Sequence, residues 1–289
     1  MTDLITSLPQ RAVDDYKSDE HPTWCPGCGD FGVLNAVYTA LKTKGFAPEE
    51  VVAVSGIGCS SRMPYFMSTY GFHTLHGRSM PIATGVKVAN PDLKVIAVGG
   101  DGDAYAIGAG HTVHAIRRNT DICYVIMDNA IYGLTKGQTS PTSAIGFTTK
   151  TTPRGSVDNP INPLLLALAA GATFVARGFS GKPKDLAELI VRGIDHKGFA
   201  FIDTYSPCPT FNKVNTFKFY REIVEDIPAD HDVTNKVEAL RLAASENPLY
   251  TGVFYQVELP SFVDHIQAQR TGSEEDIPKV VEGLFRRFS

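Results

Sequence analysis

The sequence has little of what membrane-spanning and nucleic-acid-binding chains carry. Its longest apolar runs fall short of the roughly 18 residues that a membrane-spanning helix needs. Basic and acidic residues nearly balance, 27 against 31 for a net charge of −4, and no block of like charge stands out. The electrostatic attraction that dominates binding to nucleic acids and anionic membranes is therefore missing. The 43% apolar content over 289 residues is instead typical of a globular protein with a full core.

Cysteine is also scarce. Five cysteines in 289 residues are too few and too unevenly spaced for the disulfide framework of a secreted protein. Residues 1–20 are polar, lack the apolar stretch of a secretory signal, and are predicted to form a tail. We expect a cytoplasmic protein that binds a small molecule or another protein, and cysteines with a task other than disulfide formation.

Short apolar runs alternate with helix-like segments through most of the chain. Strands are predicted at 51–56, 94–100, 121–129, 174–178 and 199–206, and helices at 30–45, 81–90, 104–118, 162–172 and 183–195. Apolar runs closed by Gly, Asp, Asn or Cys indicate a parallel α/β sheet, whose ligands bind outside the carboxyl ends of the strands. Residues 137–163, rich in Gly, Thr, Ser and Pro, are predicted to be a long functional loop.

The chain becomes more charged and less regular after about residue 220, with helices predicted only at 232–247 and 276–287. We therefore predict three parts. Residues 1–20 form the tail, residues 21–215 form the α/β domain, and residues 216–289 form an extension that packs on a partner subunit.

Two polar motifs stand at the ends of neighbouring predicted strands. Gly100-Asp101-Gly102 directly follows one strand, and Asn129 ends the next. Carboxylate and amide oxygens suit Mg²⁺, which usually binds phosphate oxygens as well, and glycines let the backbone approach those phosphates. The pattern favours a diphosphate site over plain turns at strand ends. A dinucleotide site is disfavoured, because the first strand is not followed by G-x-G-x-x-G.

Cys25 and Cys28 form a C-x-x-C motif on a loop that leads into a helix. The setting Trp-Cys-Pro-Gly-Cys resembles a thioredoxin dithiol, but the Pro-Gly order is reversed and no strand precedes it. Cys123 lies within a predicted strand and is expected to be a buried core residue.

The strings GDGDAYAIGAGHTVHAIRRN and MDNAIYGLTKGQ resemble the β subunit of 2-oxoacid:ferredoxin oxidoreductases, and Gly-Asp-Gly followed by Asn resembles the motif of thiamine-diphosphate enzymes. The similarity spans roughly residues 20–215. It implies a three-layer parallel sheet of the thiamine-diphosphate-binding type with an irregular C-terminal extension. It also implies Mg²⁺ held by Asp101, Asn129 and the backbone carbonyl of Ile131, and cofactor contacts from Ile57, Gly58, Cys59, Ser60, Gly102, Asp103, Gly133 and Leu134.

The same resemblance implies that Cys25, Cys28, Cys59 and Cys208 together bind one 4Fe-4S cluster. All four fall in predicted loops. Spacing alone fits a Cys₄ zinc site equally well, because zinc and iron–sulfur clusters share thiolate ligands. Function favours the cluster, since an oxidoreductase that forms a carbanion on thiamine needs a nearby one-electron acceptor and zinc has no redox chemistry.

Three further residues are candidates at the substrate end. His76, in the segment LHGRSMPIATG, is expected to contact thiamine or substrate. Arg62 and Lys136 each follow a site loop, and a cation there would bind a second carboxylate on the substrate. This makes 2-oxoglutarate the preferred substrate, with pyruvate or a branched 2-oxoacid as alternatives.

The resemblance implies reversible, coenzyme A-dependent oxidative decarboxylation, with electrons passing from thiamine diphosphate through the cluster to ferredoxin. Only the diphosphate-binding half of a thiamine site is expected here. An α subunit is therefore expected to supply the pyrimidine-binding domain and its activating glutamate in an α₂β₂ assembly. Two other functions stay open: a thiamine-dependent decarboxylase or carboligase without electron transfer, and a non-catalytic scaffold stabilised by zinc.

Overall fold

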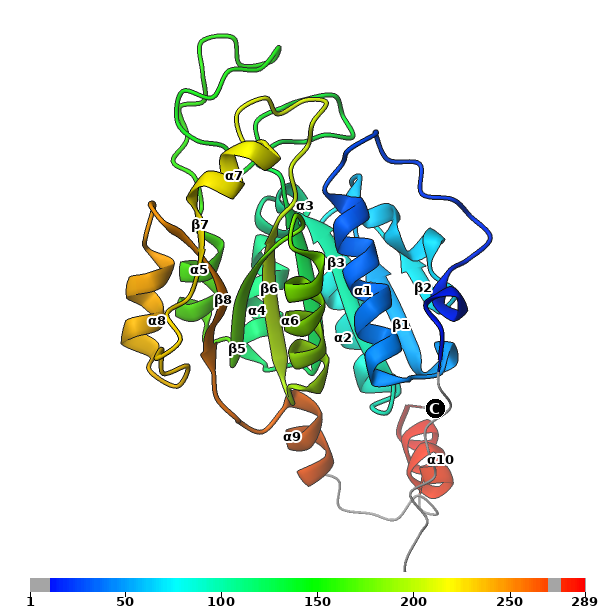
Figure 1. Cartoon of the computed structure of the whole chain (residues 1–289). Helices are drawn as coiled ribbons and strands as arrows, with labels where there is room; N and C mark the ends of the chain where they lie inside the picture. Colours follow the sequence, from blue (N-terminus) through cyan, green and yellow to red (C-terminus); the bar gives the residue numbers. More distant parts are fainter. Residues whose placement is uncertain (1–10, 270–276, 289) are drawn as a thin grey trace, which may run out of the picture.

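The protein is built on one eight-stranded sheet, seen in the computed structural model, which describes residues 11–269 and 277–288 (Figure 1). The strand order is β2-β1-β3-β4-β6-β5-β8-β7. Its strands are β1 Val51–Ser55, β2 Tyr70–His73, β3 Lys94–Gly100, β4 Ile122–Asp128, β5 Phe174–Phe179, β6 Phe199–Tyr205, β7 Val224–Asp226 and β8 Leu249–Gln256. Every neighbouring pair is parallel except β5 and β8, which pair antiparallel. The five predicted strands are confirmed.

Helices cover both faces of this sheet, which gives three layers (Figure 1). The α-helices are α1 Asp30–Lys44, α2 Ser79–Ala89, α3 Asp101–Tyr105, α4 Ala109–Arg117, α5 Pro163–Ala170, α6 Pro183–Asp195, α7 Phe217–Ile223, α8 Lys236–Ala243, α9 Phe262–Ala268 and α10 Ile277–Phe288. Short 3₁₀ helices are η1 Val13–Tyr16, η2 Pro48–Glu50 and η3 Ser60–Phe66. Helices α1 and α6 lie on one face, and α2, α4 and α5 on the other. The predicted fold class is confirmed.

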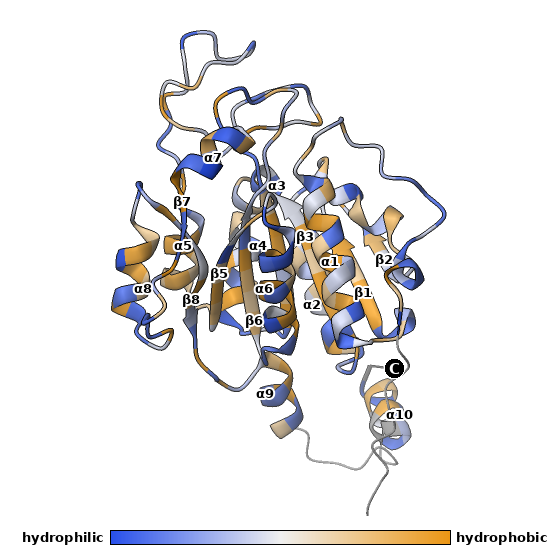
Figure 2. Ribbon diagram, in the orientation of Figure 1, coloured by the Kyte–Doolittle hydropathy of each residue, from blue (hydrophilic) through white to orange (hydrophobic). Residues whose placement is uncertain are grey.

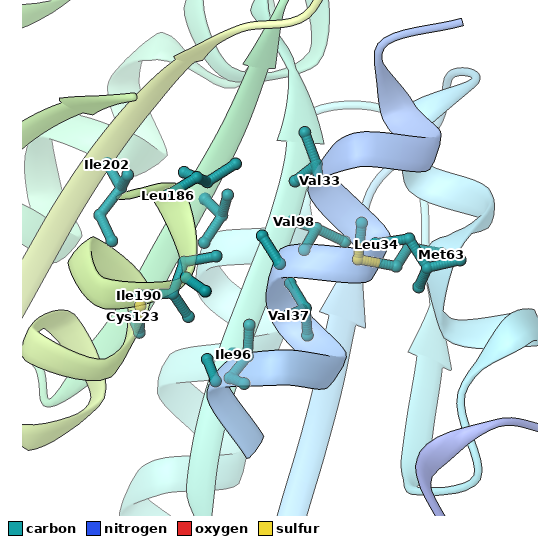
Figure 3. Close-up of a cluster of buried hydrophobic side chains, with 14 of the residues drawn as sticks. Val33, Leu34, Val37, Met63, Ile96, Val98, Cys123, Leu186, Ile190 and Ile202 are labelled. Atoms are coloured by element: carbon teal, nitrogen blue, oxygen red, sulfur yellow. The ribbon is translucent and has the colours of Figure 1, made fainter. Parts of the chain in front are cut away.

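Apolar side chains fill the space between the layers. In Figure 3, Val37 of α1 and Ile190 of α6 point towards Ile96 of β3 and Cys123 of β4. Cys123 is 3% exposed, so its predicted role in core packing is confirmed. Figure 2 shows apolar strands at the centre and polar residues on the outer sides of the helices, as expected for strands buried on both faces.

The helix predicted over 104–118 is instead two helices, α3 and α4, separated at Gly108. The helix is interrupted there because the backbone at Gly108 lies very close to the backbone at Gly77. A Cβ at Gly77 would lie 2.6 Å from the Gly108 nitrogen, and one at Gly108 would lie 2.2 Å from the Asp103 carbonyl oxygen. Two glycines make this approach possible. It brings residue 77, which precedes α2, beside the loop that follows α3.

The C-terminal part is more regular than its sequence indicates. Strand β8 joins the main sheet next to β5, with Phe174 opposite Gln256, and β7 extends the sheet by one more strand. The pattern of β8 is obscured by Gly252, whose φ is 130°, and by polar residues within LYTGVFYQ. The helix predicted at 232–247 is shortened to α8, whereas α10 agrees with the helix predicted at 276–287.

Part of the predicted tail packs against the domain. Residues 1–10 lie outside the described residues, but the Tyr16 side chain in η1 is fully buried, and its hydroxyl donates to the carbonyl oxygens of Leu41 and Phe46 at 3.0 and 2.8 Å. Edge strand β2 is not predicted from the sequence, because its four residues are all exposed. Across the described ranges, no helix combines the length and apolarity needed to cross a bilayer.

Candidate active site

A cavity of about 540 Å³ opens at the carboxyl ends of β1, β3 and β4. This is the edge of a parallel sheet where ligands are expected. It is lined by Ile57, Gly58, Cys59 and Ser60 after β1, by His76, by Gly100, Asp101, Gly102 and Asp103 after β3, and by Asn129, Ile131, Tyr132, Gly133, Leu134, Thr135 and Gln138 after β4. All the predicted magnesium ligands and cofactor contacts therefore lie in one cavity.

Asp101 begins α3 and is 2% exposed. Its Oδ2 accepts hydrogen bonds from the hydroxyl groups of Ser140 and Thr142, the latter at 2.7 Å. The Thr142 hydroxyl also lies 2.8 Å from Oδ1 of Asp128, so it links two carboxylates. The loop predicted over 137–163 has no helix or strand between Gln138 and the start of α5, and it supplies both hydroxyl groups.

Buried negative charge accumulates behind this part of the cavity. Burial raises the pKa of Asp101 to about 6, and burial together with Asp101 and Asp203 raises the pKa of Asp128 well above its usual range. Asp203 is paired with Arg177, whose Nε lies 3.2 Å from Oδ2. The group between Asp101 and Asp128 is the hydroxyl of Thr142, which carries no charge that could offset theirs. A divalent cation bound at Asp101 would therefore stabilise the ionised form of both carboxylates.

The turn after β4 carries the two other residues that are predicted to bind Mg²⁺, Asn129 and Ile131. Asn129 Oδ1 accepts a hydrogen bond from the Ile131 nitrogen at 3.1 Å, and the Ala130 nitrogen donates to Asp128 at 3.0 Å. Ala130 has a φ of 53°, in the left-handed region that residues other than glycine rarely adopt. This strained turn places Asn129 and Ile131 on the cavity wall, where their oxygen atoms fit the preference of Mg²⁺.

Two positions on the cavity wall require glycine. A Cβ at Gly102 would lie 2.1 Å from Cε1 of Tyr132, whose hydroxyl donates to the Gly102 carbonyl oxygen at 3.2 Å. Gly58, on the opposite loop, has a φ of 142°. These positions expose bare backbone to the cavity, as a bound diphosphate requires.

The Asp103 side chain is turned towards two loops. Its Oδ1 accepts hydrogen bonds from the backbone nitrogens of Ile57 and Gly77, at 2.9 and 2.7 Å, and lies 3.0 Å from Nδ1 of His76. Burial raises the pKa of Asp103, and these donors oppose the rise. The carboxylate thereby joins the loop after β1 to the segment that precedes α2.

The cysteine loops meet next to the cavity. A Cβ placed on Gly133 would lie 3.6 Å from the sulfur of Cys59 and 3.7 Å from that of Cys208. The Cys28 nitrogen donates to the Cys25 carbonyl oxygen at 3.0 Å, and the charges of Cys59 and Cys208 both raise the pKa of Cys28. Cys25 is exposed and Cys208 buried, and Cys59 lines the cavity.

Burial is the main cause of raised thiol pKa values here. It raises the pKa of Cys59 to about 11 and that of Cys28 further, and the nearby buried carboxylate of Asp30 adds to both. Within residues 11–269 and 277–288, no three or more His, Cys, Asp or Glu side chains are grouped so as to hold a metal ion. The four cysteine positions therefore stay a prediction, supported by the close approach of Cys59 and Cys208.

Arg62 and Lys136 do not line the 540 Å³ cavity. Arg62 lies half-buried in η3, where its charge opposes the rise that burial causes in the pKa of Cys59. Lys136 is exposed, with a φ of 75°, and lines a second cavity of about 490 Å³ that shares Ile131 with the first. Their contact with substrate stays a prediction.

Sequence reasoning missed the support of Asp101. Ser140, Thr142 and Asp128 contact or neighbour the predicted ligands, and Tyr132 and Gln138 line the cavity. The string Thr-Ser-Pro-Thr at 139–142 could have indicated this support, because hydroxyl side chains in a long loop are candidate hydrogen-bond donors to a buried carboxylate.

Comparison with known proteins agrees with this geometry. Residues 56–204 match the family described as thiamine pyrophosphate enzyme, C-terminal TPP binding domain. Residues 208–270 match the family that describes the C-terminal part of the pyruvate ferredoxin oxidoreductase beta chain. The fold and the cavity thus define a thiamine-diphosphate-binding domain of an enzyme.

Similar chains identify the family more closely. The 2-oxoacid:ferredoxin oxidoreductase subunit beta of Saccharolobus solfataricus is 44% identical over 269 residues, which cover 88% of each chain. The 2-oxoglutarate oxidoreductase subunit KorB of Mycobacterium tuberculosis is 49% identical over 72% of this chain and 55% of that protein. A structure of 2-oxoglutarate:ferredoxin oxidoreductase from Magnetococcus marinus, with 2-oxoglutarate, coenzyme A and succinyl-CoA bound, is 48% identical, with a TM-score of 0.90 over 96% of this chain and 97% of that one. This chain belongs to the β subunits of 2-oxoacid:ferredoxin oxidoreductases.

Proposed function

We propose that this chain is the β subunit of a 2-oxoglutarate:ferredoxin oxidoreductase that converts the 2-oxoacid and coenzyme A reversibly to acyl-CoA and CO₂. The observation that carries the proposal is the cavity itself. Its wall joins a magnesium and diphosphate site, at Asp101, Asn129 and Ile131, to Cys59, whose sulfur lies near that of Cys208. Cofactor and electron acceptor would thus occupy adjacent positions.

Each part of the cavity has a task in this proposal. Asp101, Asn129 and the Ile131 carbonyl oxygen hold Mg²⁺, and the backbone at Gly102, Gly133 and Leu134 accommodates the diphosphate. Thiamine supplies the stabilised carbanion chemistry, and the protein orients it. Ile57, Gly58, Cys59 and Ser60 form the wall between the cofactor and the cysteine loops.

One 4Fe-4S cluster, held by Cys25, Cys28, Cys59 and Cys208, would pass electrons to ferredoxin. The donor set consists of four thiols on converging loops, which fits this cluster. Zinc accepts the same thiolate ligands but has no redox chemistry, so it would leave the adjacent thiamine site without an electron acceptor.

The preference for 2-oxoglutarate is supported by cations near the cavity and by the relatives. Neither cation lines the 540 Å³ cavity, but Arg62 lies two residues after the lining residue Ser60, and Lys136 lines the neighbouring cavity. We propose that one of them binds the second substrate carboxylate. Relatives from Mycobacterium tuberculosis and Methanocaldococcus jannaschii are named 2-oxoglutarate oxidoreductase and 2-oxoglutarate synthase subunits, and the Magnetococcus marinus structure holds 2-oxoglutarate.

The proposal includes an α subunit in an α₂β₂ assembly. That subunit would supply the pyrimidine-binding domain, the activating glutamate and most of the coenzyme A site. Exposed apolar side chains beside the cavity, Leu75, Ile107 and Leu134, are 73%, 55% and 47% exposed and are suited to such a contact.

The test is anaerobic co-purification with the partner subunit, followed by iron, zinc, magnesium and thiamine analysis and turnover with a panel of 2-oxoacids. We expect four irons and one thiamine diphosphate per chain, fastest turnover with 2-oxoglutarate, and no turnover by this chain alone. Preference for pyruvate or a branched 2-oxoacid would revise the substrate. Zinc in place of iron, or activity without an electron acceptor, would refute the electron-transfer function.

A further inference from the structure

One ring nitrogen of His76 contacts a buried carboxylate, and the other is free within the described part of the chain. Its Nδ1 lies 3.0 Å from Oδ1 of Asp103, and its ring lines the cavity, with 38% of the side chain exposed. Among the described residues, Nε2 has no hydrogen-bond partner. The imidazole therefore presents one free ring nitrogen to whatever the cavity binds.

The contact with Asp103 determines which nitrogen carries the proton. An aspartate oxygen that already accepts two backbone N–H groups, from Ile57 and Gly77, can only accept a third hydrogen bond. The neutral imidazole thus donates from Nδ1 and keeps the lone pair on Nε2. Asp103 is 2% exposed, and its two backbone donors hold the carboxylate in place, so the ring orientation is fixed as well.

The other neighbours of the ring do not compete for Nε2. Tyr132 packs edge-on against His76, with ring centroids 6.1 Å apart, but the Tyr132 hydroxyl donates to the Gly102 carbonyl oxygen. The backbone N–H of the next residue, Gly77, is engaged with Asp103. The lone pair is thus available to a bound molecule.

A lone pair that faces a cavity binds a hydrogen-bond donor. Ionised phosphate and carboxylate groups and keto oxygens only accept hydrogen bonds, so neither a 2-oxoacid nor a diphosphate can donate one to Nε2 of neutral His76. In the proposed reaction, the thiol of coenzyme A is a donor, and its proton must leave when the thioester forms. The arrangement of carboxylate, imidazole and acidic proton is that of a general base with an orienting residue.

We propose that His76 is the base that accepts the thiol proton of coenzyme A, and that Asp103 is the positioning residue that holds His76 ready for it. The S–H bond would break with its proton moving to Nε2, and the sulfur would use the remaining electron pair to bond to the acyl carbon. The bond between the acyl carbon and its thiamine carrier would break in the same step, with its electron pair left on the carrier, and ferredoxin would have taken the two electrons of the 2-oxoacid oxidation. In the reverse reaction, the imidazolium returns the proton to the departing sulfur. This inference rests on the proposed function, because that function supplies coenzyme A.

The test uses the anaerobic complex with the partner subunit and four variants: His76→Gln, Asp103→Asn, the double variant, and His73→Gln as a matched control. His73 is a nearby exposed histidine whose Nδ1 lies 2.8 Å from the Ser61 carbonyl oxygen. Three quantities are measured: bound thiamine diphosphate, the rate of cluster reduction by 2-oxoacid without coenzyme A, and coenzyme A-dependent turnover.

We expect His76→Gln to keep its thiamine diphosphate and its rate of reduction without coenzyme A, and to lose about a hundred-fold in coenzyme A-dependent kcat. Asp103→Asn should lose a similar factor, because an asparagine amide can donate to Nδ1 and shift the ring proton to Nε2. The double variant should be no slower than His76→Gln, since Asp103 acts through His76. His73→Gln should match the unmodified complex.

Different failures point to different causes. If Asp103→Asn lowers the coenzyme A-dependent kcat by the same factor in the His76→Gln background as in the unmodified complex, Asp103 acts independently of His76. That result would overturn the role of Asp103 as the residue that positions His76. Loss of bound thiamine diphosphate in His76→Gln, or slower reduction without coenzyme A, would assign His76 to the cofactor or to an earlier step. If the unmodified complex shows no reduction by any 2-oxoacid, the proposed function itself fails.

Discussion

Trp24 donates a hydrogen bond from its indole Nε1 to the carbonyl oxygen of Cys59 at 2.6 Å. This bond joins the loop of the C-x-x-C motif to the loop that lines the cavity. The indole is 8% exposed and packs edge-on against Phe31 and Phe66, with ring centroids 5.3 and 5.0 Å away. A single side chain thus holds together two of the loops that carry the proposed cluster ligands.

We predict that Trp24→Phe weakens cluster retention without removing the fold. Phenylalanine keeps part of the aromatic packing but loses the hydrogen bond, at a cost of about 1 kcal/mol. Iron release from the anaerobic complex, followed with a chelator, should be several-fold faster than in the unmodified complex. Phe31→Leu, which disturbs the packing and leaves the hydrogen bond, is the control. Equal release rates in Trp24→Phe and the unmodified complex would contradict this role.

We predict that Asp101→Ala abolishes retention of thiamine diphosphate and Mg²⁺. The substitution removes the one carboxylate among the proposed magnesium ligands, and Asn129 and Ile131 alone offer only neutral oxygens. Thiamine content after gel filtration is the measurement, and iron content, which should be unchanged, is the internal control. A normal thiamine content would disprove the magnesium assignment.

Thr142→Val should weaken cofactor binding less severely. The hydroxyl of Thr142 is within 2.7 Å of Asp101 and 2.8 Å of Asp128, and hydrogen bonds to charged groups contribute about 1.5–3 kcal/mol. We expect the Kd for thiamine diphosphate in the presence of Mg²⁺ to rise about ten-fold. Thr142→Ser keeps the hydroxyl and should restore affinity. If the serine variant binds as weakly as the valine variant, packing rather than the hydroxyl is responsible.

Gly102→Ala should impair cofactor binding because the new Cβ would lie 2.1 Å from the Tyr132 ring. The ring would have to move within the cavity wall. Gly85→Ala in α2 is the matched control, since a Cβ added there would meet no side chain or more distant backbone of the described residues within 4 Å, and helix interiors favour alanine by about 0.5–1 kcal/mol. Thermal unfolding and thiamine binding separate the two effects. The expectation fails if both variants bind thiamine diphosphate normally.

The contribution of His196 to the stability of the protein should be lost below about pH 6.5. This histidine is 5% exposed, its Nε2 lies 2.7 Å from the Thr173 hydroxyl, and burial lowers its pKa from 6.5. Between the folded pKa and the unfolded one, the unfolded state binds more protons, so the contribution is full above pH 6.5 and is lost as pH falls.

Urea unfolding of the complex between about pH 7.5 and 5.5 measures this loss. His196→Gln cannot titrate, so the free energy of unfolding of the unmodified protein relative to that of the variant should fall as pH is lowered over the same range. A variant with the same slope as the unmodified protein would assign the pH dependence to other groups.

Local chemistry explains which elements were predictable. Strands β1, β3, β4, β5 and β6 are buried on both faces, so their apolar runs are visible without any knowledge of pairing. Strands β2 and β8 lie at or near the edge of the sheet, where exposed residues and Gly252 hide the pattern. The interruption between α3 and α4 at Gly108 depends on contact with Gly77, which is distant in sequence. The residues around Gly108 therefore do not predict it.

The sequence by itself determined the parallel sheet, the position of the cavity at the strand ends and the residues that line it after β1, β3 and β4. The sheet, and the position of Asp101 and Asn129 at its strand ends, follow from apolar periodicity and from the residues that end each strand. The other lining residues follow from the resemblance to the β subunits of 2-oxoacid:ferredoxin oxidoreductases. Only the tertiary structure decided how those residues are used. It set Thr142 between Asp101 and Asp128, turned Asp103 towards His76, and placed Trp24 on Cys59. The reason is that each of these contacts joins segments far apart in the chain, and their meeting depends on how the layers pack.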